Sequence, residues 1–266
     1  MSLLIRLLLL PRALLPLTFL AGLLAGSLCN ALVTWTETGK NPFVLLTHCH
    51  ECGGKRGFFG SLPIVSSLKK CPVCGEKPKK RFILLSVLSP ALCALSALQF
   101  WGDSPARAVL TMLACLLFLM VAACDREIRQ IPNRFLLALV AVGLGLFILD
   151  RSDSLSMIDR ILGGALGFAL FLAVSLLASK LSKREALGGG DVKLAGAAGL
   201  VLGWEKLVYG VLIAAIALTV WMLLLRIRRG RDRTREYPFA PFLTVGFIAV
   251  LLFGEPIISL YLGLFR

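Results

Sequence analysis

Long apolar runs dominate this sequence, and their length limits what the chain can fold into. Several runs hold about 17 to 25 residues with few charges, the length that an α-helix needs to cross a bilayer. Because 58% of all residues are hydrophobic, we predict an all-α, polytopic membrane protein. The eight expected spans are residues 8–34, 83–101, 105–124, 134–149, 158–179, 188–204, 206–225 and 240–263.

Basic residues fall mostly on one side of these spans. The sequence holds 29 Lys and Arg against 15 Asp and Glu, a formal net charge of +14. Most of the cations lie in the loops 36–82, 125–134, 180–187 and 226–239. By the positive-inside rule these loops are cytoplasmic, and both chain ends lie on the opposite side. In a membrane protein this charge predicts contact with anionic lipid headgroups and no nucleic-acid partner.

Four of the eight cysteines form a metal-binding pattern between the first two spans. Cys49, Cys52, Cys71 and Cys74 follow C-x2-C-x18-C-x2-C, a spacing typical of four-thiolate zinc sites. Two disulfides are the alternative, but a cytoplasmic location keeps thiols reduced. Residues 36–82 are too poor in large apolar side chains to fold without a cross-link, so the predicted zinc is structural.

The sequence therefore divides into three parts. Residues 1–35 form transmembrane helix 1, residues 36–82 form a small cytoplasmic zinc-binding domain inserted between helices 1 and 2, and residues 83–266 form a membrane core of helices 2–8. His48 and His50 flank the first cysteine pair, but with four thiolates available we expect them not to bind the metal.

Two aspartates each lie at the cytoplasmic end of a different predicted span. Asp125 follows the third span, and Asp191 opens the sixth directly after Gly188, Gly189 and Gly190. Two carboxylates in a recess of low dielectric share a proton and can act as base and acid on a water molecule, as in aspartic proteases. The glycines would let an extended substrate backbone approach them.

The same aspartates also have a purely structural interpretation. Asp191 could cap the N-terminus of its helix, and Asp125 could form a surface ion pair with Arg126. Glu127 and Glu185 lie near the same face, so chemistry alone does not single out the aspartate pair.

The acidic residues on the opposite side of the spans are simpler to interpret. Asp150 and Asp159 fall in a loop on that side, where water is available. We therefore expect both side chains to be solvated.

At the two aspartates the sequence resembles the type IV prepilin peptidases, membrane aspartic proteases with a G-x-G-D signature. Residues 188–194 match that signature and its V-K-L extension, which contains Lys193. Asp125 with Ile131 and Pro132 is similar to the family's first motif. Further motifs agree in their order along the chain, at residues 26–30, 62–66 and 238–242.

The resemblance implies a peptidase of the bacterial inner membrane with both termini in the periplasm. It would remove the short basic leader from type IV prepilins or type II secretion pseudopilins, after a glycine, on the cytoplasmic side. The residues implied are the catalytic pair Asp125 and Asp191, the substrate loop with Gly188, Gly189, Gly190 and Lys193, and the zinc ligands Cys49, Cys52, Cys71 and Cys74.

The resemblance also implies N-methylation of the new N-terminus with S-adenosylmethionine, because many members are bifunctional. Here Phe82, Ile83 and Ser86 replace the Tyr, Pro and Glu of a family motif associated with methyl transfer, so that activity stays open. Asn133 and Ala240 replace a family Asp and Gly, and neither departure removes a proposed catalytic carboxylate.

Two other interpretations remain open. A presenilin-like intramembrane protease would cut within spans, but the zinc domain and the absence of a Pro-Ala-Leu motif from the last span argue against it. A non-catalytic assembly factor or transporter would use the zinc module for docking. Such a protein would tolerate substitution of both aspartates and lose partner binding when its cysteines are replaced.

Overall fold

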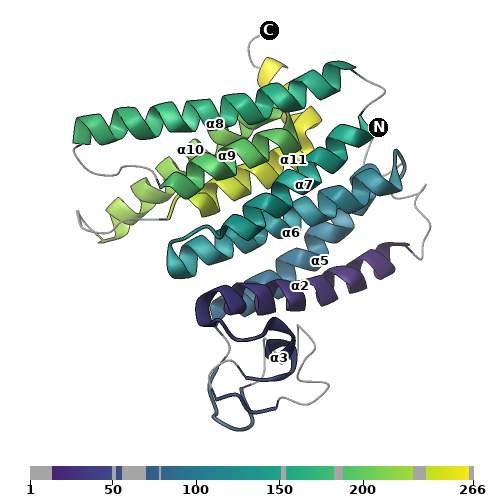
Figure 1. Cartoon of the computed structure of the whole chain (residues 1–266), viewed down its shortest axis with the longest axis vertical. Coiled ribbons are helices and arrows are strands. Elements are labelled where there is room, and N and C mark those ends of the chain that lie inside the picture. Colours follow the sequence, from purple (N-terminus) through teal and green to yellow (C-terminus); the bar gives the residue numbers. More distant parts are fainter. Residues whose placement is uncertain are drawn as a thin grey trace. The chain divides into compact units, whose positions relative to one another are not determined.

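The computed structural model describes residues 14–49, 52–55, 70–77, 79–150, 154–182, 188–229 and 238–263. These ranges are helical apart from short connections and one isolated antiparallel bridge between His48 and Lys55 (Figure 1), so the all-α prediction is confirmed. The helices are α2 (Leu14–Thr38), α3 (Pro42–Thr47), α5 (Lys80–Phe100), α6 (Pro105–Ile128), α7 (Asn133–Leu149), α8 (Ser154–Ser182), α9 (Gly189–Leu202), α10 (Trp204–Arg229) and α11 (Ala240–Gly263).

Among the described residues, six helices are long and apolar enough to cross a membrane, namely α2, α5, α6, α8, α10 and α11. They correspond to six of the eight predicted spans. The first predicted span begins at residue 8, outside the described residues, and α2 continues to Thr38. It stops at Gly39, whose φ of 70° is left-handed and whose N–H donates to the Trp35 carbonyl, a common helix C-terminus.

The predicted spans 134–149 and 188–204 correspond to the shorter helices α7 and α9. These have 17 and 14 residues, or about 26 and 21 Å at 1.5 Å per residue, against a hydrocarbon core of ~30 Å. Gly203, with φ 84°, ends α9 because few other residues adopt that conformation. The count of eight spans therefore stays a prediction.

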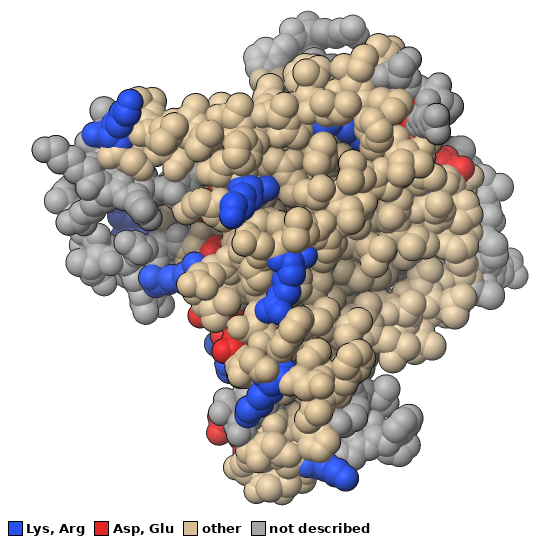
Figure 2. All heavy atoms as spheres, in the orientation of Figure 1, with Lys and Arg blue, Asp and Glu red and all other residues tan. Residues whose placement is uncertain are grey.

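Membrane-length helices carry many apolar side chains on their outer faces. Leu170 and Leu177 of α8, and Val220 and Leu223 of α10, are all exposed. Charged residues cover only a small part of the face shown in Figure 2. A bilayer would cover such apolar surface, which is too extensive for a typical water-soluble monomer.

The chain forms two compact units, residues 1–123 and 124–266. This division does not test the predicted domain boundaries, which stay predictions. In the first unit α2 packs along α5 (Figure 1). A Cβ atom at Gly22 would lie 2.5 Å from Pro90 Cα, and one at Gly26 would overlap Ser89 Oγ, so both glycines permit close contact between the helix backbones.

In the second unit α9 packs against both α7 and α8, and α10 packs against α11 (Figure 1). Glycines again bring helices together, because Gly163 and Gly167 of α8 lie directly against Gly199 and the Ala195 carbonyl of α9. Most side chains of α9 are buried. This packing fixes the helix whose first turn carries Asp191.

The far end of α9 is held by buried charges. Arg160 Nε donates to Asp150 Oδ2 at 2.7 Å, and Arg160 Nη1 donates to the carbonyls of Leu200 and Val201. Asp150 is only 6% exposed, so the prediction that it is solvated was wrong. The guanidinium satisfies carbonyls that the last turn of a helix leaves without an intrahelical partner, and the carboxylate balances its buried charge.

Candidate active site and metal site

Asp125 lies in the last turn of α6 and is buried, with 8% of its surface exposed. Its Oδ2 accepts a hydrogen bond from the Ala240 N–H at 3.2 Å. Ala240 is the first residue of α11, where backbone N–H groups have no intrahelical acceptor. Asp125 therefore accepts a hydrogen bond from the first residue of a helix that begins 115 residues further along the chain.

Asp191 lies in the first turn of α9, and Gly188 is the N-cap residue. The Asp191 N–H donates to the Gly188 carbonyl at 3.0 Å. Gly188 thus occupies the N-cap position, three residues before Asp191. The Asp191 carboxylate interacts with the Gly188 N–H, as a carboxylate in the first turn of a capped helix does, so the structural interpretation of Asp191 stays open.

The second unit brings the two aspartates together. Asp125 is close enough to Asp191 for the two charges to repel one another. Glu127, one of the competing carboxylates, is exposed, whereas Asp125 is buried. Glu185, the other, lies outside the described residues. Burial and mutual repulsion favour a shared proton, which is the condition for acid–base chemistry by a carboxyl pair.

The three glycines before Asp191 differ in their surroundings. Gly188 and Gly189 are exposed, and a Cβ atom at Gly189 would meet nothing within 4 Å. A Cβ atom at Gly190 would lie 3.2 Å from Ile131 Cβ, so Gly190 permits the contact between α9 and the segment before α7. The first two glycines are therefore exposed, whereas the third lies in a helix contact.

Lys193 joins the same two elements. Its Nζ donates to Asn133 Oδ1 at 3.3 Å, and Asn133 is the first residue of α7. The lysine is exposed. Asparagine is neutral, so this contact does not neutralise Lys193, and no carboxylate in the described part of the chain forms an ion pair with it.

The four cysteines converge, as their spacing predicts. All four sulfur atoms lie within 4.8 Å of one another. The Cys49–Cys74 and Cys52–Cys71 sulfur distances are 3.9 and 3.8 Å. Four thiolates at about 2.3 Å from a tetrahedral zinc ion would be separated by ~3.8 Å. The cluster therefore has the size that a zinc ion requires.

Each cysteine pair is held by the same backbone turn. The N–H of Gly53 donates to the Cys49 carbonyl at 3.0 Å, and the N–H of Gly75 donates to the Cys71 carbonyl at 2.9 Å. Both glycines have left-handed φ, 70° and 72°. Backbone N–H groups of Cys74 and Val73 lower the pKa of the Cys71 thiol, whereas, against a backbone hydrogen bond from Glu76, burial and the neighbouring thiols raise the pKa of Cys74 to about 12.

His48 contacts its own helix, because its Nδ1 lies 3.1 Å from the Val44 carbonyl oxygen. Among the described residues the group that could hold a metal ion consists of the four cysteines. His50, the other flanking histidine, lies outside the described residues.

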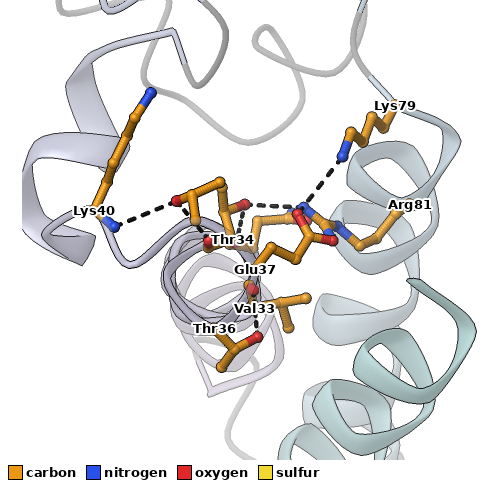
Figure 3. Close-up of polar contacts among 9 residues, drawn as sticks. Val33, Thr34, Thr36, Glu37, Lys40, Lys79 and Arg81 are labelled. Carbon is orange, nitrogen blue, oxygen red and sulfur yellow. Dashed lines mark hydrogen bonds and ion pairs between the residues drawn. The ribbon is translucent and has the colours of Figure 1, made fainter. Parts of the chain in front are cut away.

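A cluster of ionic side chains joins the chain entering the cysteine region to the chain leaving it (Figure 3). Arg81, at the start of α5, forms an ion pair with Glu37 of α2 and donates to Thr34 Oγ1 at 2.9 Å. Lys79 Nζ lies 3.5 Å from Glu37 Oε2. The Arg81 and Glu37 side chains are only 4% and 10% exposed. Arg81 and Glu37 lie 44 residues apart in the sequence. No local pattern indicates that they pair, and sequence reasoning did not find this ion pair.

Glu37→Gln is expected to lower the free energy of unfolding by about 3–5 kcal/mol, because it leaves the buried Arg81 guanidinium without its carboxylate. The measurement is thermal and denaturant unfolding of the purified protein in detergent. Lys79→Gln is the control, with an expected loss below about 1 kcal/mol, because this lysine is 40% exposed. The double variant Glu37→Gln/Arg81→Gln should recover part of the loss, and equal losses for Glu37→Gln and Lys79→Gln would contradict this role.

Six membrane-length helices among the described residues indicate a multi-pass helical membrane protein, in which the charges of Asp125 and Asp191 act on one another. The model of the type IV leader peptidase family, peptidase A24, matches residues 111–223, which contain both aspartates. A prepilin leader peptidase/N-methyltransferase of Burkholderia pseudomallei is 33% identical over 212 residues, covering 78% of this chain and 67% of that protein. The chain belongs to this family of bacterial multi-pass membrane proteins, so the resemblance stated from the motifs is confirmed.

Other relatives cover more of the chain at lower identity. Prepilin leader peptidase/N-methyltransferases of Stutzerimonas stutzeri and Pseudomonas aeruginosa are each 26% identical, over 230 and 284 residues. These matches cover 85% and 95% of this chain and 78% and 94% of the relatives. No solved structure matches the chain.

Proposed function

We propose that this protein is a membrane aspartic endopeptidase that removes the basic leader of type IV prepilins or type II secretion pseudopilins after a glycine. The observation that carries the proposal is the pair Asp125 and Asp191, brought together at two helix ends although 65 residues separate them in the sequence. One carboxylate takes a proton from water as the water oxygen attacks the scissile carbonyl, and the other carboxyl protonates the carbonyl oxygen.

The substrate would approach Asp191 along the exposed glycines. Gly188 and Gly189 are exposed and carry no side chain, which favours the approach of an extended backbone, and Gly190 permits the contact of α9 with Ile131. Lys193 lies beside this loop, and its contact among the described residues is with the neutral Asn133, so it can bind a lipid phosphate or a carboxylate of the substrate. Anionic lipid headgroups would also hold the basic leader near the protein.

The proposed topology follows from the charge distribution. Eight spans would place the cysteine cluster and both aspartates on the cytoplasmic side of the inner membrane and both termini in the periplasm. The domains are then helix 1 at 1–35, the zinc domain at 36–82 and the peptidase core at 83–266.

A structural zinc ion is proposed for Cys49, Cys52, Cys71 and Cys74. The sulfur separations support it. The ion would link two turns that carry few large apolar side chains, so it would supply folding energy and no step of peptide hydrolysis.

N-methylation with S-adenosylmethionine is the second activity that the names of the relatives suggest. Ser86 is buried in α5 where the family motif has Glu, and Arg81 of that motif is paired with Glu37. The chain therefore departs from the family motif at Ser86 but keeps its Arg81. The test below separates the activities.

The test is an incubation of the purified protein in lipid vesicles with a prepilin and S-adenosylmethionine, followed by intact mass spectrometry of the product. We expect a product without the leader. An added methyl group would show the second activity, and its absence would show a dedicated peptidase. A substrate that stays uncut would overturn the proposed function and favour the docking-protein interpretation.

A further inference from the structure

Two neighbouring residues of α8 hold the corner where α9 ends and α10 begins. Arg160 donates from Nη1 to the carbonyls of Leu200 and Val201 in the last turn of α9. Asp159 accepts the Trp204 N–H through Oδ1 at 3.0 Å, and Trp204 is the first residue of α10. A cation thus satisfies carbonyls at the end of one helix, and an anion satisfies an N–H at the start of the next.

Gly203 forms the turn between these two helices. Its φ is 84°, a conformation that residues with a side chain rarely adopt. A Cβ atom at this position would overlap Asp159 Oδ2, so the carboxylate occupies the place where a side chain would begin. A larger residue at position 203 would therefore displace Asp159 from the Trp204 N–H.

Arg160 is buried and its charge is balanced. The side chains of Arg160 and Asp150 are only 11% and 5% exposed, and Nε donates to Asp150 Oδ2 at 2.7 Å. One guanidinium therefore bonds to a carboxylate and to two carbonyls, with donors held in the fixed directions of a planar group. A lysine carries the same charge on a single nitrogen, so it cannot present donors in this arrangement.

The helix α9 connects this corner to Asp191. It contains no proline over its 14 residues, so it forms one continuous rod of ~21 Å. A Cβ atom at Gly167 of α8 would lie 2.4 Å from the Ala195 carbonyl oxygen of α9. Such contacts between small residues set how closely two helices approach, but they tolerate sliding of one helix along the other. The directional hydrogen bonds at the corner fix the position of α9 along its axis.

We propose that Asp159 and Arg160 are positioning residues for the Asp191 carboxylate, which lies at the opposite end of the same helix. The inference rests on the proposed peptidase function. Because a helix moves as a unit, a shift of its last turn along the axis also shifts its first turn, and with it Asp191 relative to Asp125. A misplacement of about 1 Å can lower the rate of an enzyme by about 10²-fold. Neither positioning residue takes part in proton transfer.

The first test compares leader removal by Arg160→Gln and Arg160→Lys with that by the wild type. Arg160→Gln removes the charge and the planar donor group, whereas Arg160→Lys keeps the charge. If hydrogen-bond geometry sets the position, both variants should lower kcat per folded molecule by about tenfold. The rates are measured well below the unfolding midpoint of each variant, with the folded fraction determined in parallel.

Val250→Ala is the matched control for lost stability. Val250 is fully buried in α11 and is not part of the corner. Its truncation leaves a cavity and lowers the free energy of unfolding. We expect this variant to keep the wild-type kcat per folded molecule.

Asp159 provides an independent pair of variants. Asp159→Ala removes the acceptor for the Trp204 N–H, and kcat per folded molecule should fall by about tenfold. Asp159→Asn keeps a side-chain carbonyl oxygen that can accept the same N–H, so it should retain most of the activity. Rescue by asparagine would show that the hydrogen bond, and not the negative charge, holds the corner.

The pH dependence of kcat/KM is the readout that a loss of stability alone would not change. Its two limbs report the apparent pKa values of the carboxyl pair, and the interaction of the two carboxyls separates these values. A greater distance between Asp125 and Asp191 weakens that interaction. The limbs should therefore lie closer together in Arg160→Gln and Asp159→Ala than in the wild type, and they should stay unmoved in Val250→Ala.

The outcomes separate this inference from the proposed function. Normal kcat per folded molecule and unmoved limbs in Arg160→Gln and Asp159→Ala would overturn the positioning role and leave the proposed function standing. If Arg160→Gln does not fold, the comparison of Asp159→Ala with Asp159→Asn decides in the same way. A wild-type protein that does not cleave would overturn both.

Discussion

Asp191→Asn is expected to reduce kcat/KM for leader removal by at least about 10³-fold, and Asp125→Asn by a similar factor. Asparagine has nearly the shape of aspartate but can neither take a proton from water nor give one to the scissile carbonyl. Because the two carboxyls act as a unit, losing one removes most of the benefit of both, and the double variant should be little worse than either single variant.

The measurement is a time course of leader removal from a prepilin in lipid vesicles, with product identified by mass. Asp103→Asn is the control, because Asp103 is exposed in the turn between α5 and α6 and should leave the rate unchanged. Circular dichroism and gel filtration should show that all variants stay folded. A single aspartate variant with normal processing would refute the catalytic pair and favour the docking-protein interpretation.

Removal of the metal is expected to unfold the cysteine region. Zinc binding contributes on the order of 10 kcal/mol to the folding of small four-ligand sites. Cys71→Ala should therefore lose the metal and expose the chain around the cysteine pairs to protease. The measurements are metal content by mass spectrometry and limited proteolysis followed by peptide mapping.

Cys93→Ala is the matched control, because Cys93 is a buried cysteine of α5 outside the cluster. It should keep one metal ion per chain and the protease resistance of the wild type. Acidification should release the ion as thiolates are protonated. A Cys71→Ala variant that keeps its metal, or a wild-type protein that contains none, would refute the metal site.

Both aspartates lie in the unit 124–266, whereas the four cysteines lie in the unit 1–123. Because the metal would bind residues of the first unit, we expect its removal to destabilise that region. Comparing leader removal by Cys71→Ala with that by Asp191→Asn would separate a folding role from a catalytic one.

Features that depend on local pattern could be predicted from the sequence. Six predicted spans appear as helices long enough for a bilayer, because span length follows directly from membrane thickness. Cys49, Cys52, Cys71 and Cys74 converge as their spacing predicts, because each pair occupies one turn. The motifs around Asp125 and Asp191 were sufficient to identify the family.

Features that depend on distant partners needed the tertiary structure. The prediction that Asp150 is solvated was wrong. Asp150 accepts a hydrogen bond from Arg160, and Arg160 also donates to carbonyls at the end of α9. These contacts form only when the helices pack. The early end of α9 at Leu202 was also missed. In the sequence Gly203 looks like any other glycine of an apolar run, and nothing there indicates its left-handed φ.

The sequence by itself thus determined the helical membrane class, the cysteine cluster and the family motifs that contain Asp125 and Asp191, because each is encoded in residues close together in the chain. Only the tertiary structure decided what surrounds the two aspartates. The Ala240 N–H, 115 residues further along the chain, donates to Asp125. Helix packing creates this contact, and no local pattern indicates it.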